Sequence, residues 1–208
     1  MSSSLLVAEN LLFDSRLALF HCTERWLAIA DLHYGYELSL RASGALFPDL
    51  GMGHIEQNVA SLVTDYRPEV VLFLGDLVHT PAATAAFKQW LATLAESIPQ
   101  LILIRGNHDR RLKTFPLHDH WRSGSQLFHH GHESIETKLG DIVFSGHLHP
   151  AHFVSDQAGF HQNLPALCRT SGGWILPAFS PWAAGGVPID VEILDRWVSN
   201  QKKIWRVK

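Results

Sequence analysis

The chain has 208 residues, 46% of them hydrophobic, and a formal net charge of −3 with histidine counted as neutral. This length suits one domain spanning residues 1–208, and the hydrophobic fraction is enough for a large core, which excludes a disordered chain. The slight negative charge argues against a protein that coats duplex DNA by charge alone. The unusual feature is the content of 14 histidines, because histidine is the commonest metal ligand and titrates near neutral pH.

The cysteines and the N-terminus bear on the compartment. Cys22 and Cys168 lie in mostly apolar contexts, which favours two free thiols in a reducing compartment over a single disulfide. The N-terminus has no basic segment ahead of an apolar one, so it does not resemble a secretory signal. No apolar stretch approaches the roughly 18 residues that span a bilayer. We therefore expect a cytoplasmic protein with no membrane contact.

The first half of the chain alternates predicted strands and helices. Residues 11–20 are typical of a hairpin that turns at Asp14-Ser15. Further along, apolar residues such as Ile55 and Val59 recur at the spacing of a packed helix. The predicted order is strand 26–30, helix 53–66, strand 70–74, helix 82–97 and strand 101–104. This alternation predicts a parallel sheet with right-handed crossovers.

The second half contains short apolar runs with no helical stretch of comparable length between them. This pattern predicts mainly antiparallel strands, and hence two packed sheets flanked by helices. The predicted strands cover residues 126–129, 142–145, 174–176, 187–194 and 204–207.

Five short polar clusters punctuate the chain, and four of them directly follow an apolar run. A buried strand that stops at a polar side chain is how an α/β sheet builds a site on one edge. Together the clusters supply seven nitrogen or oxygen ligands and one spare histidine, enough for two divalent cations and a proton donor. The clusters are Asp31-Leu32-His33, Gly75-Asp76, Gly106-Asn107-His108-Asp109, His130-Gly131 and Gly146-His147-Leu148-His149.

Each cluster alone is a weak signal, since each also reads as a polar turn at a strand end, but five in order point to a metal site. The third cluster adds a second role. His108 can give or take a proton, while Asp109 fixes its orientation and stabilises the charged imidazolium. We therefore expect His108 and Asp109 to be catalytic.

This ordered series resembles the calcineurin-type metallophosphoesterases over about residues 26–150. The resemblance implies a four-layer αββα sandwich of two mixed sheets flanked by helices. It also implies that His108 faces the phosphate and protonates the leaving oxygen. By the same resemblance, one metal is held by Asp31, His33, Asp76 and His149, and the other by Asp76, Asn107, His130 and His147, so that Asp76 bridges the pair.

The ligand set and the metals suit phosphoester chemistry. Nitrogen and oxygen ligands without a thiolate favour Mn, Fe or Zn, and we expect Mn first. Two cations about 3.5–4 Å apart lower the pKa of a shared water and clamp phosphate oxygens. We therefore expect hydrolysis of phosphodiester bonds by attack of a metal-bridging hydroxide.

Three further residues are candidates for substrate binding, each with a structural alternative. His79 either touches substrate or is a polar residue at a helix start. Arg110 belongs to a basic group with Arg105, Arg111 and Lys113 that either binds a phosphate or is a solvated helix face. His132 flanks the predicted ligand His130 and is a candidate contact. Neighbouring His129 is expected to point to the opposite face of its strand.

Four segments resemble the bacterial metallophosphoesterases associated with an ATP-dependent DNA ligase and a DEXH-box helicase. They are residues 31–37, 41–48, 75–79 and 176–181. That resemblance implies a role in DNA repair with the ligase and the helicase as partners. From the short stretch after His149 we expect no capping domain that holds a duplex. A small diester, a strand end or DNA presented by a partner fits better.

Other functions and assemblies stay open at this point. The same metals would serve a phosphomonoesterase or a nucleotide pyrophosphatase. A non-catalytic scaffold in a repair complex is disfavoured because every ligand is present. Phe179 and Trp182, beside residues 183–186, are either part of a contact between subunits of a homo-oligomer or part of the core.

Overall fold

The computed structural model describes residues 3–46, 50–155, 159, 161–183, 185 and 190–207. Its first sheet has seven strands in sequential order. Neighbours pair antiparallel from β1 to β4 and parallel from β4 to β7. The strands are β1 (Ser4–Ala8), β2 (Leu11–Asp14), β3 (Ala18–His21), β4 (Trp26–Ile29), β5 (Val70–Leu74), β6 (Gln100–Ile104) and β7 (Leu117–His118).

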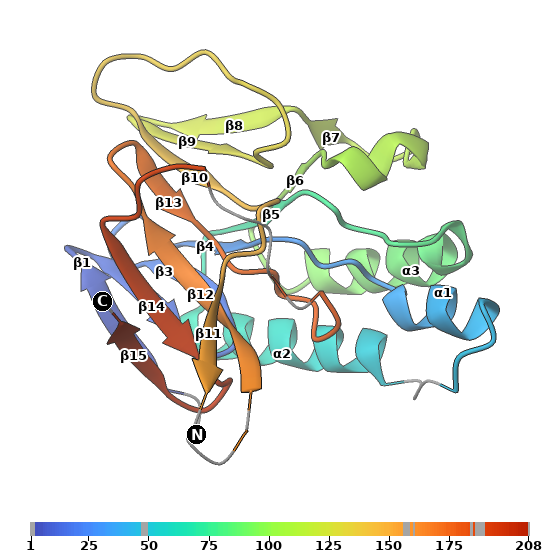
Figure 1. The fold of residues 1–208 in the computed structure, drawn as a ribbon. Helices are drawn as coiled ribbons and strands as arrows, with labels where there is room; N and C mark the ends of the chain where they lie inside the picture. Colours follow the sequence, from blue (N-terminus) through green and yellow to red (C-terminus); the bar gives the residue numbers. More distant parts are fainter. Residues whose placement is uncertain are drawn as a thin grey trace.

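The helices connect the parallel strands of this sheet. The described helices are α1 (Tyr36–Ala42), α2 (Gly51–Tyr66), η1 (Pro81–Ala83), α3 (Thr84–Ala95) and η2 (Asn107–Arg111). Figure 1 shows α1 and α3 on the right of the molecule and β14 and β15 on the left. Of the described helices, none combines the length and hydropathy needed to span a bilayer.

The second sheet has eight strands in the order β15-β14-β12-β13-β10-β9-β8, with β11 paired to β12. It is mixed: β9, β10 and β13 run parallel, and the other pairs are antiparallel. The strands are β8 (His120–Ser123), β9 (Gln126–His129), β10 (Ile142–Ser145), β11 (Ala151–Ser155), β12 (His161–Arg169), β13 (Gly173–Ile175), β14 (Asp195–Ser199) and β15 (Ile204–Val207).

Aromatic side chains join the two sheets. Trp26 of β4 is almost fully buried, and its ring meets those of Phe128 and Phe144 edge-on, with centroids 5.0 Å apart in both cases. Its indole N–H donates to Gln126 Oε1 at 2.5 Å, which satisfies the one polar atom of this side chain. The first parallel strand is thereby fixed against β9 and β10, whose ends carry the later histidine clusters.

The structure confirms the predicted α/β sandwich of two mixed sheets with flanking helices. The hairpin, the strands of the first half and the two long helices form at or within a few residues of their predicted bounds. The described helices all precede β7, so the second half contributes strands. Its strand pairs are mainly antiparallel, as predicted. The exception is β10, which lies parallel to both neighbours. Strand direction depends on pairing between distant segments, which local periodicity does not contain.

Some predictions in the second half need correction. No strand forms over residues 190–194; the strand begins at Asp195, and residues 187–189 lie outside the described residues. Phe179 is buried at 4% exposure, so it belongs to the core and not to a subunit contact, while Trp182 is half-buried. Residues 184 and 186 of the adjoining segment, and 47–48 of segment 41–48, are also outside the description. Both cysteines are free thiols, as predicted.

Candidate metal centre

Parallel strands bring the five polar clusters to one edge of the sandwich. Asp31, Asp76 and Asn107 come shortly after β4, β5 and β6, which run parallel in that order. His130 and His147 follow β9 and β10, which are also parallel. Because the carboxyl ends of parallel strands lie at the same edge, residues more than 100 positions apart in sequence converge.

Backbone contacts tie the two halves together at Asp31. The carboxylate of Asp31 accepts the N–H of His147, with the amide nitrogen 2.9 Å from Oδ2 and 3.2 Å from Oδ1. The main chain of Asp31 in turn accepts the N–H of Ser180 at 3.2 Å, and Phe179 donates to Ala30 at 2.9 Å. Segment 176–181 therefore holds the Asp31 loop in place. The sequence singled this segment out but did not reveal that contact.

All seven predicted metal ligands lie together. Six of them form two groups, and in each group one donor atom per residue lies within 4.8 Å of the others. The first group is Asp31, His33 and His149, and the second is Asp76, His130 and His147. Asn107 Oδ1 is 3.1 Å from His130 Nε2, which places Asn107 beside the second group. The carboxylate of Asp76 lies between the groups, with Oδ1 3.4 Å from His130 Nε2 and Oδ2 3.7 Å from His33 Nε2.

The protonation of these groups follows from burial and mutual charge. Burial lowers the pKa of His33 to about 4, although the charges of Asp31 and Asp76 act in the opposite direction. Burial alone would raise the pKa of Asp76, but the hydrogen bond and charge of His130 hold that pKa well below its usual range. Neutral imidazole and ionised carboxylate are the forms that bind metal ions.

Five of the seven predicted ligands have left-handed backbone conformations. Residues other than glycine rarely adopt a positive φ, and each such residue costs about 1–3 kcal/mol. Such strain persists where the surrounding structure enforces it, often at functional sites. The φ values are 55° at Asp31, 42° at His33, 48° at Asp76, 69° at His147 and 43° at His149.

Two glycines of the clusters allow these residues to approach one another. A Cβ atom on Gly106 would lie 2.2 Å from the backbone nitrogen of Asp76, and one on Gly146 would lie 2.5 Å from Asp31 Oδ2. Both distances are too short for any side chain without movement of the polypeptide. Glycine is therefore required at these positions for the loops to pack against the ligands.

The family model for calcineurin-like phosphoesterases matches residues 25–134, which is more than half of the chain. The chain belongs to the calcineurin-like phosphoesterase family. It is thus a metal-dependent hydrolase of phosphoesters, from a family whose members typically have a dinuclear metal centre. No curated protein matches the sequence.

Solved structures agree with this fold. The crystal structure of Pseudomonas putida nuclease MPE has a TM-score of 0.75 at 21% identity and covers 100% of both chains. An E. coli phosphoesterase, Yfce, gives a TM-score of 0.49 at 17% identity, covering 88% of this chain and 97% of that one. Chaetomium thermophilum Vps29 gives 0.41 at 16% identity, with coverage of 88% and 95%. The chain thus shares its fold with nuclease MPE over its whole length.

The catalytic pairing of His108 with Asp109 needs correction in this phosphoesterase. The buried carboxylate of Asp109 accepts the backbone N–H groups of Leu77 at 2.9 Å and Gly106 at 2.8 Å, with a longer bond from Val78 at 3.3 Å. Within the described chain no contact joins it to the His108 imidazole. Asp109 therefore fastens the loop after β5 to the loop after β6. The side chain turns toward backbone amides because η2 starts at Asn107 and directs it back to Gly106.

His108 itself lies at the edge of the ligand groups. Its side chain is 44% exposed, and its Nε2 atom is 3.9 Å from Asp76 Oδ2. Its backbone N–H donates to Asp76 Oδ1 at 3.0 Å. The imidazole is thus partly exposed to solvent and lies next to the predicted bridging carboxylate.

The three residues predicted to bind substrate line cavities that also contain His108 or His130. His79 and Arg110 line a cavity of about 300 Å³ together with His108 and Arg111. His132 lines a second cavity, of about 200 Å³, with His130, and the ring centroids of these two residues are 5.1 Å apart. His129 lines that same cavity, and burial lowers its pKa to about 4. Arg105 is paired with Asp119 at 2.8 Å, so its charge is already balanced.

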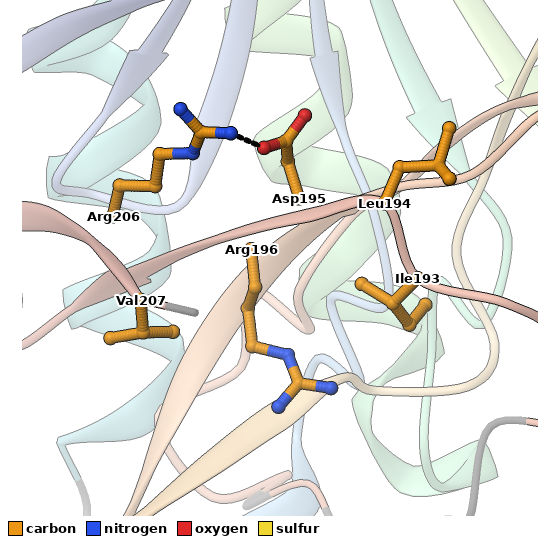
Figure 2. Close-up of a pocket in the computed structure, with 6 residues that line it drawn as sticks. All are labelled: Ile193, Leu194, Asp195, Arg196, Arg206 and Val207. Carbon is orange, nitrogen blue, oxygen red and sulfur yellow. Dashed lines mark hydrogen bonds and ion pairs between the residues drawn. The ribbon is translucent and has the colours of Figure 1, made fainter.

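A larger cavity of about 590 Å³ lies apart from the predicted ligands, around β14 and β15. Figure 2 shows Asp195 of this cavity joined to Arg206, and Arg196 directed away from that pair. Asp195 also pairs with Arg169. None of the seven predicted ligands lines this cavity, and its only carboxylate in the described chain is engaged in ion pairs, so it does not contribute to the metal centre.

Proposed function

We propose that this phosphoesterase is a dinuclear phosphodiesterase. The observation that carries the proposal is the position of Asp76 between two ligand groups, with the exposed His108 next to it and two cavities lined by residues of the site. One group would supply ligands for each cation, and Asp76 would be a ligand shared by both.

The residues present fit two divalent cations. Asp31 and Asp76 are 0% and 2% exposed, and among the described residues neither pairs with lysine or arginine. Buried carboxylates require a compensating positive charge, and metal ions would supply it. Asp31, His33, Asp76 and His149 would hold one cation. Asp76, Asn107, His130 and His147 would hold the other.

The donor set also bears on the choice of metal. Imidazole and carboxylate donors without a thiolate favour Mn, with Fe or Zn as alternatives. When bound, a pair of such cations lowers the pKa of a shared water and neutralises charge on phosphate oxygens.

The protein's own groups complete the chemistry. His108 lies at the solvent-facing edge of the site and would protonate the leaving oxygen. The side chains of Arg110 and Arg111 line the cavity on the His108 side and would attract an anionic substrate. Asp109 acts through the loops that it fastens and would not touch the substrate.

The two cavities support a diester over a monoester. His79 and His108 line a cavity of about 300 Å³, and His130 and His132 line one of about 200 Å³. Open volume therefore adjoins the ligand groups in two places. A phosphodiester carries a substituent on each side of the phosphorus, whereas a monoester would fill only one of these cavities.

We further propose that the natural substrate is a nucleic-acid strand or strand end, and that the protein acts in DNA repair in the cytoplasm with a ligase and a helicase. This proposal is supported by the resemblance of segments 31–37, 75–79 and 176–181 to the ligase-associated group. The net charge of −3 makes tight binding of a duplex by charge alone unfavourable, which favours a small substrate or one presented by a partner.

The experiment compares a mono- and a diester of the same aryl alcohol after loading with Mn. We expect faster turnover of bis(p-nitrophenyl) phosphate, cleavage of single-stranded oligonucleotides, and losses of at least about 100-fold in Asp76→Ala and His108→Ala. Preferential turnover of the monoester would identify a phosphomonoesterase. Metal-loaded protein that hydrolyses neither ester would favour the scaffold function.

A further inference from the structure

His79, which is not among the predicted metal ligands, contacts one of them, His33. His79 Nδ1 lies 3.3 Å from His33 Nδ1, within hydrogen-bond distance. The opposite ring atom of His33, Nε2, faces the predicted site, 3.4 Å from His149 Nε2 and 3.7 Å from Asp76 Oδ2. His33 therefore has one nitrogen directed to the ligand group and the other directed to His79.

Metal binding by His33 would determine the positions of the protons in this pair. A neutral imidazole carries one N–H, and only the unprotonated nitrogen can bind a metal ion. If His33 binds through Nε2, its proton is on Nδ1 and requires an acceptor. The acceptor at that position is His79 Nδ1, so the proton of His79 is on its Nε2 atom. A ligating histidine held in this way by an acceptor on its other nitrogen is better oriented and more basic.

The backbone builds this contact. The segments that follow β4 and β5 continue their pairing as a short ladder of backbone hydrogen bonds. In it, His33 donates its N–H to the carbonyl of Asp76 at 2.8 Å, and Tyr34 donates to that of Leu77 at 3.0 Å. His79 then donates its own N–H to Tyr34 at 3.0 Å. The ladder places the His79 side chain beside His33 at a fixed register.

An aromatic neighbour restricts the His79 ring. The rings of Tyr36 and His79 have centroids 4.3 Å apart, and His79 stacks against His108 at 5.7 Å with an interplanar angle of 21°. These contacts limit the rotation of the imidazole, so the Nδ1 atom stays directed at His33.

We propose that His79 is a positioning residue that accepts the Nδ1–H of His33 and thereby holds His33 Nε2 ready for the first cation. The proposal rests on the proposed function in one respect, namely that His33 is a metal ligand. It does not depend on whether the substrate is a diester or a monoester. It assigns to His79 a role directed at the metal site, in addition to any contact with substrate.

Two substitutions separate this role from simple packing. In His79→Asn the side-chain oxygen can occupy the place of Nδ1 and accept the same hydrogen bond, whereas the longer His79→Gln places its amide at the position of Nε2. We expect His79→Asn to retain the Mn affinity of the wild type within about threefold. His79→Gln should bind the first Mn about 10- to 100-fold more weakly, the range found when such supporting partners are removed. Titration calorimetry of the full-length protein measures both affinities.

A second readout requires neither metal nor substrate. Long-range ¹H–¹⁵N NMR of the metal-free protein distinguishes the two neutral tautomers of His33. We expect the Nδ1–H form in the wild type and in His79→Asn, and loss of that form in His79→Gln.

His118→Gln, at an exposed position of β7, is the matched control and should change neither readout, while His149→Ala should weaken Mn binding in any background.

The outcomes are decisive in both directions. Equal Mn affinity in the Asn and Gln variants, whether retained or lost, would overturn the positioning role, as would an Nε2–H tautomer of His33 in the wild type. A raised KM with unchanged Mn affinity in both variants would assign His79 to substrate contact only. If the wild type binds Mn normally but hydrolyses no phosphoester, the proposed function fails while the positioning role stands.

Discussion

The carboxylate of Asp31 accepts the backbone N–H of His147 at 2.9 Å, so one predicted ligand holds the main chain of another. The two residues follow strands of different sheets, β4 and β10, and are 116 positions apart in the sequence. Asp31 consequently has two functions. It supplies a donor to the site, and it fastens the loop that carries His147 and His149.

Substitutions at Asp31 should separate these two functions. Asp31→Asn keeps an oxygen that can accept the His147 N–H, whereas Asp31→Ala leaves a part-buried amide without a partner. We expect the Asn variant to be more stable than the Ala variant by about 1–2 kcal/mol in urea unfolding with EDTA present. Both should lose high-affinity Mn binding. Equal unfolding free energies would show that the hydrogen bond contributes nothing to joining the halves.

The left-handed backbone at His147 predicts an unusual effect of glycine. Without a Cβ atom, glycine adopts a φ of 69° at no steric cost, whereas alanine does not. We expect metal-free His147→Gly to be more stable than His147→Ala by about 1 kcal/mol in urea unfolding. At His132, whose φ is not positive, the same pair should show the reverse order. An alanine variant that is more stable at both positions would mean that the predicted strain is absent.

The backbone contacts of Asp109 predict a loss of stability that is independent of His108. Asp109→Ala removes the acceptor from two well-placed, buried amides and should lower the free energy of unfolding by about 2–4 kcal/mol. A double-mutant cycle with His108→Ala tests whether the two side chains interact. We expect a coupling energy near zero in stability, and a coupling above about 1 kcal/mol would restore the expected His108–Asp109 pair.

Tyr66 should make the protein sensitive to alkaline pH. Burial and a hydrogen bond to Asp14 Oδ2 at 2.7 Å raise the pKa of Tyr66 to about 12, from an ordinary value of about 10. Between these two values the folded state retains the proton and the unfolded state has lost it. The contribution to stability is therefore complete below pH 10 and is lost as pH rises toward 12. Urea unfolding at pH 9 to 12 should show a steeper decline for the wild type than for Tyr66→Phe, and parallel curves would contradict the shift.

Much of the site was predictable because its signal is local. Each ligand cluster adjoins the end of an apolar run, and parallel strands must bring such ends to one edge. The sequence therefore predicts one site for the clusters at Asp31, Asp76 and Asn107. The short helix α1 was missed because its seven residues bury the charged side chain of Glu37, which hides an amphipathic pattern. Strand β12 was missed because Pro165 interrupts its strand pattern.

By itself the sequence determined the residue types, the strand ends that carry them and the family series that they form, because these depend on spacing along the chain. The tertiary structure alone decided the partners of the polar atoms. A carboxylate next to a histidine in sequence can turn either to that ring or to nearby amides, and Asp109 turns to the amides. The contact of His79 with His33 likewise depends on the ladder beyond β4 and β5, which forms only when distant segments of the chain pair.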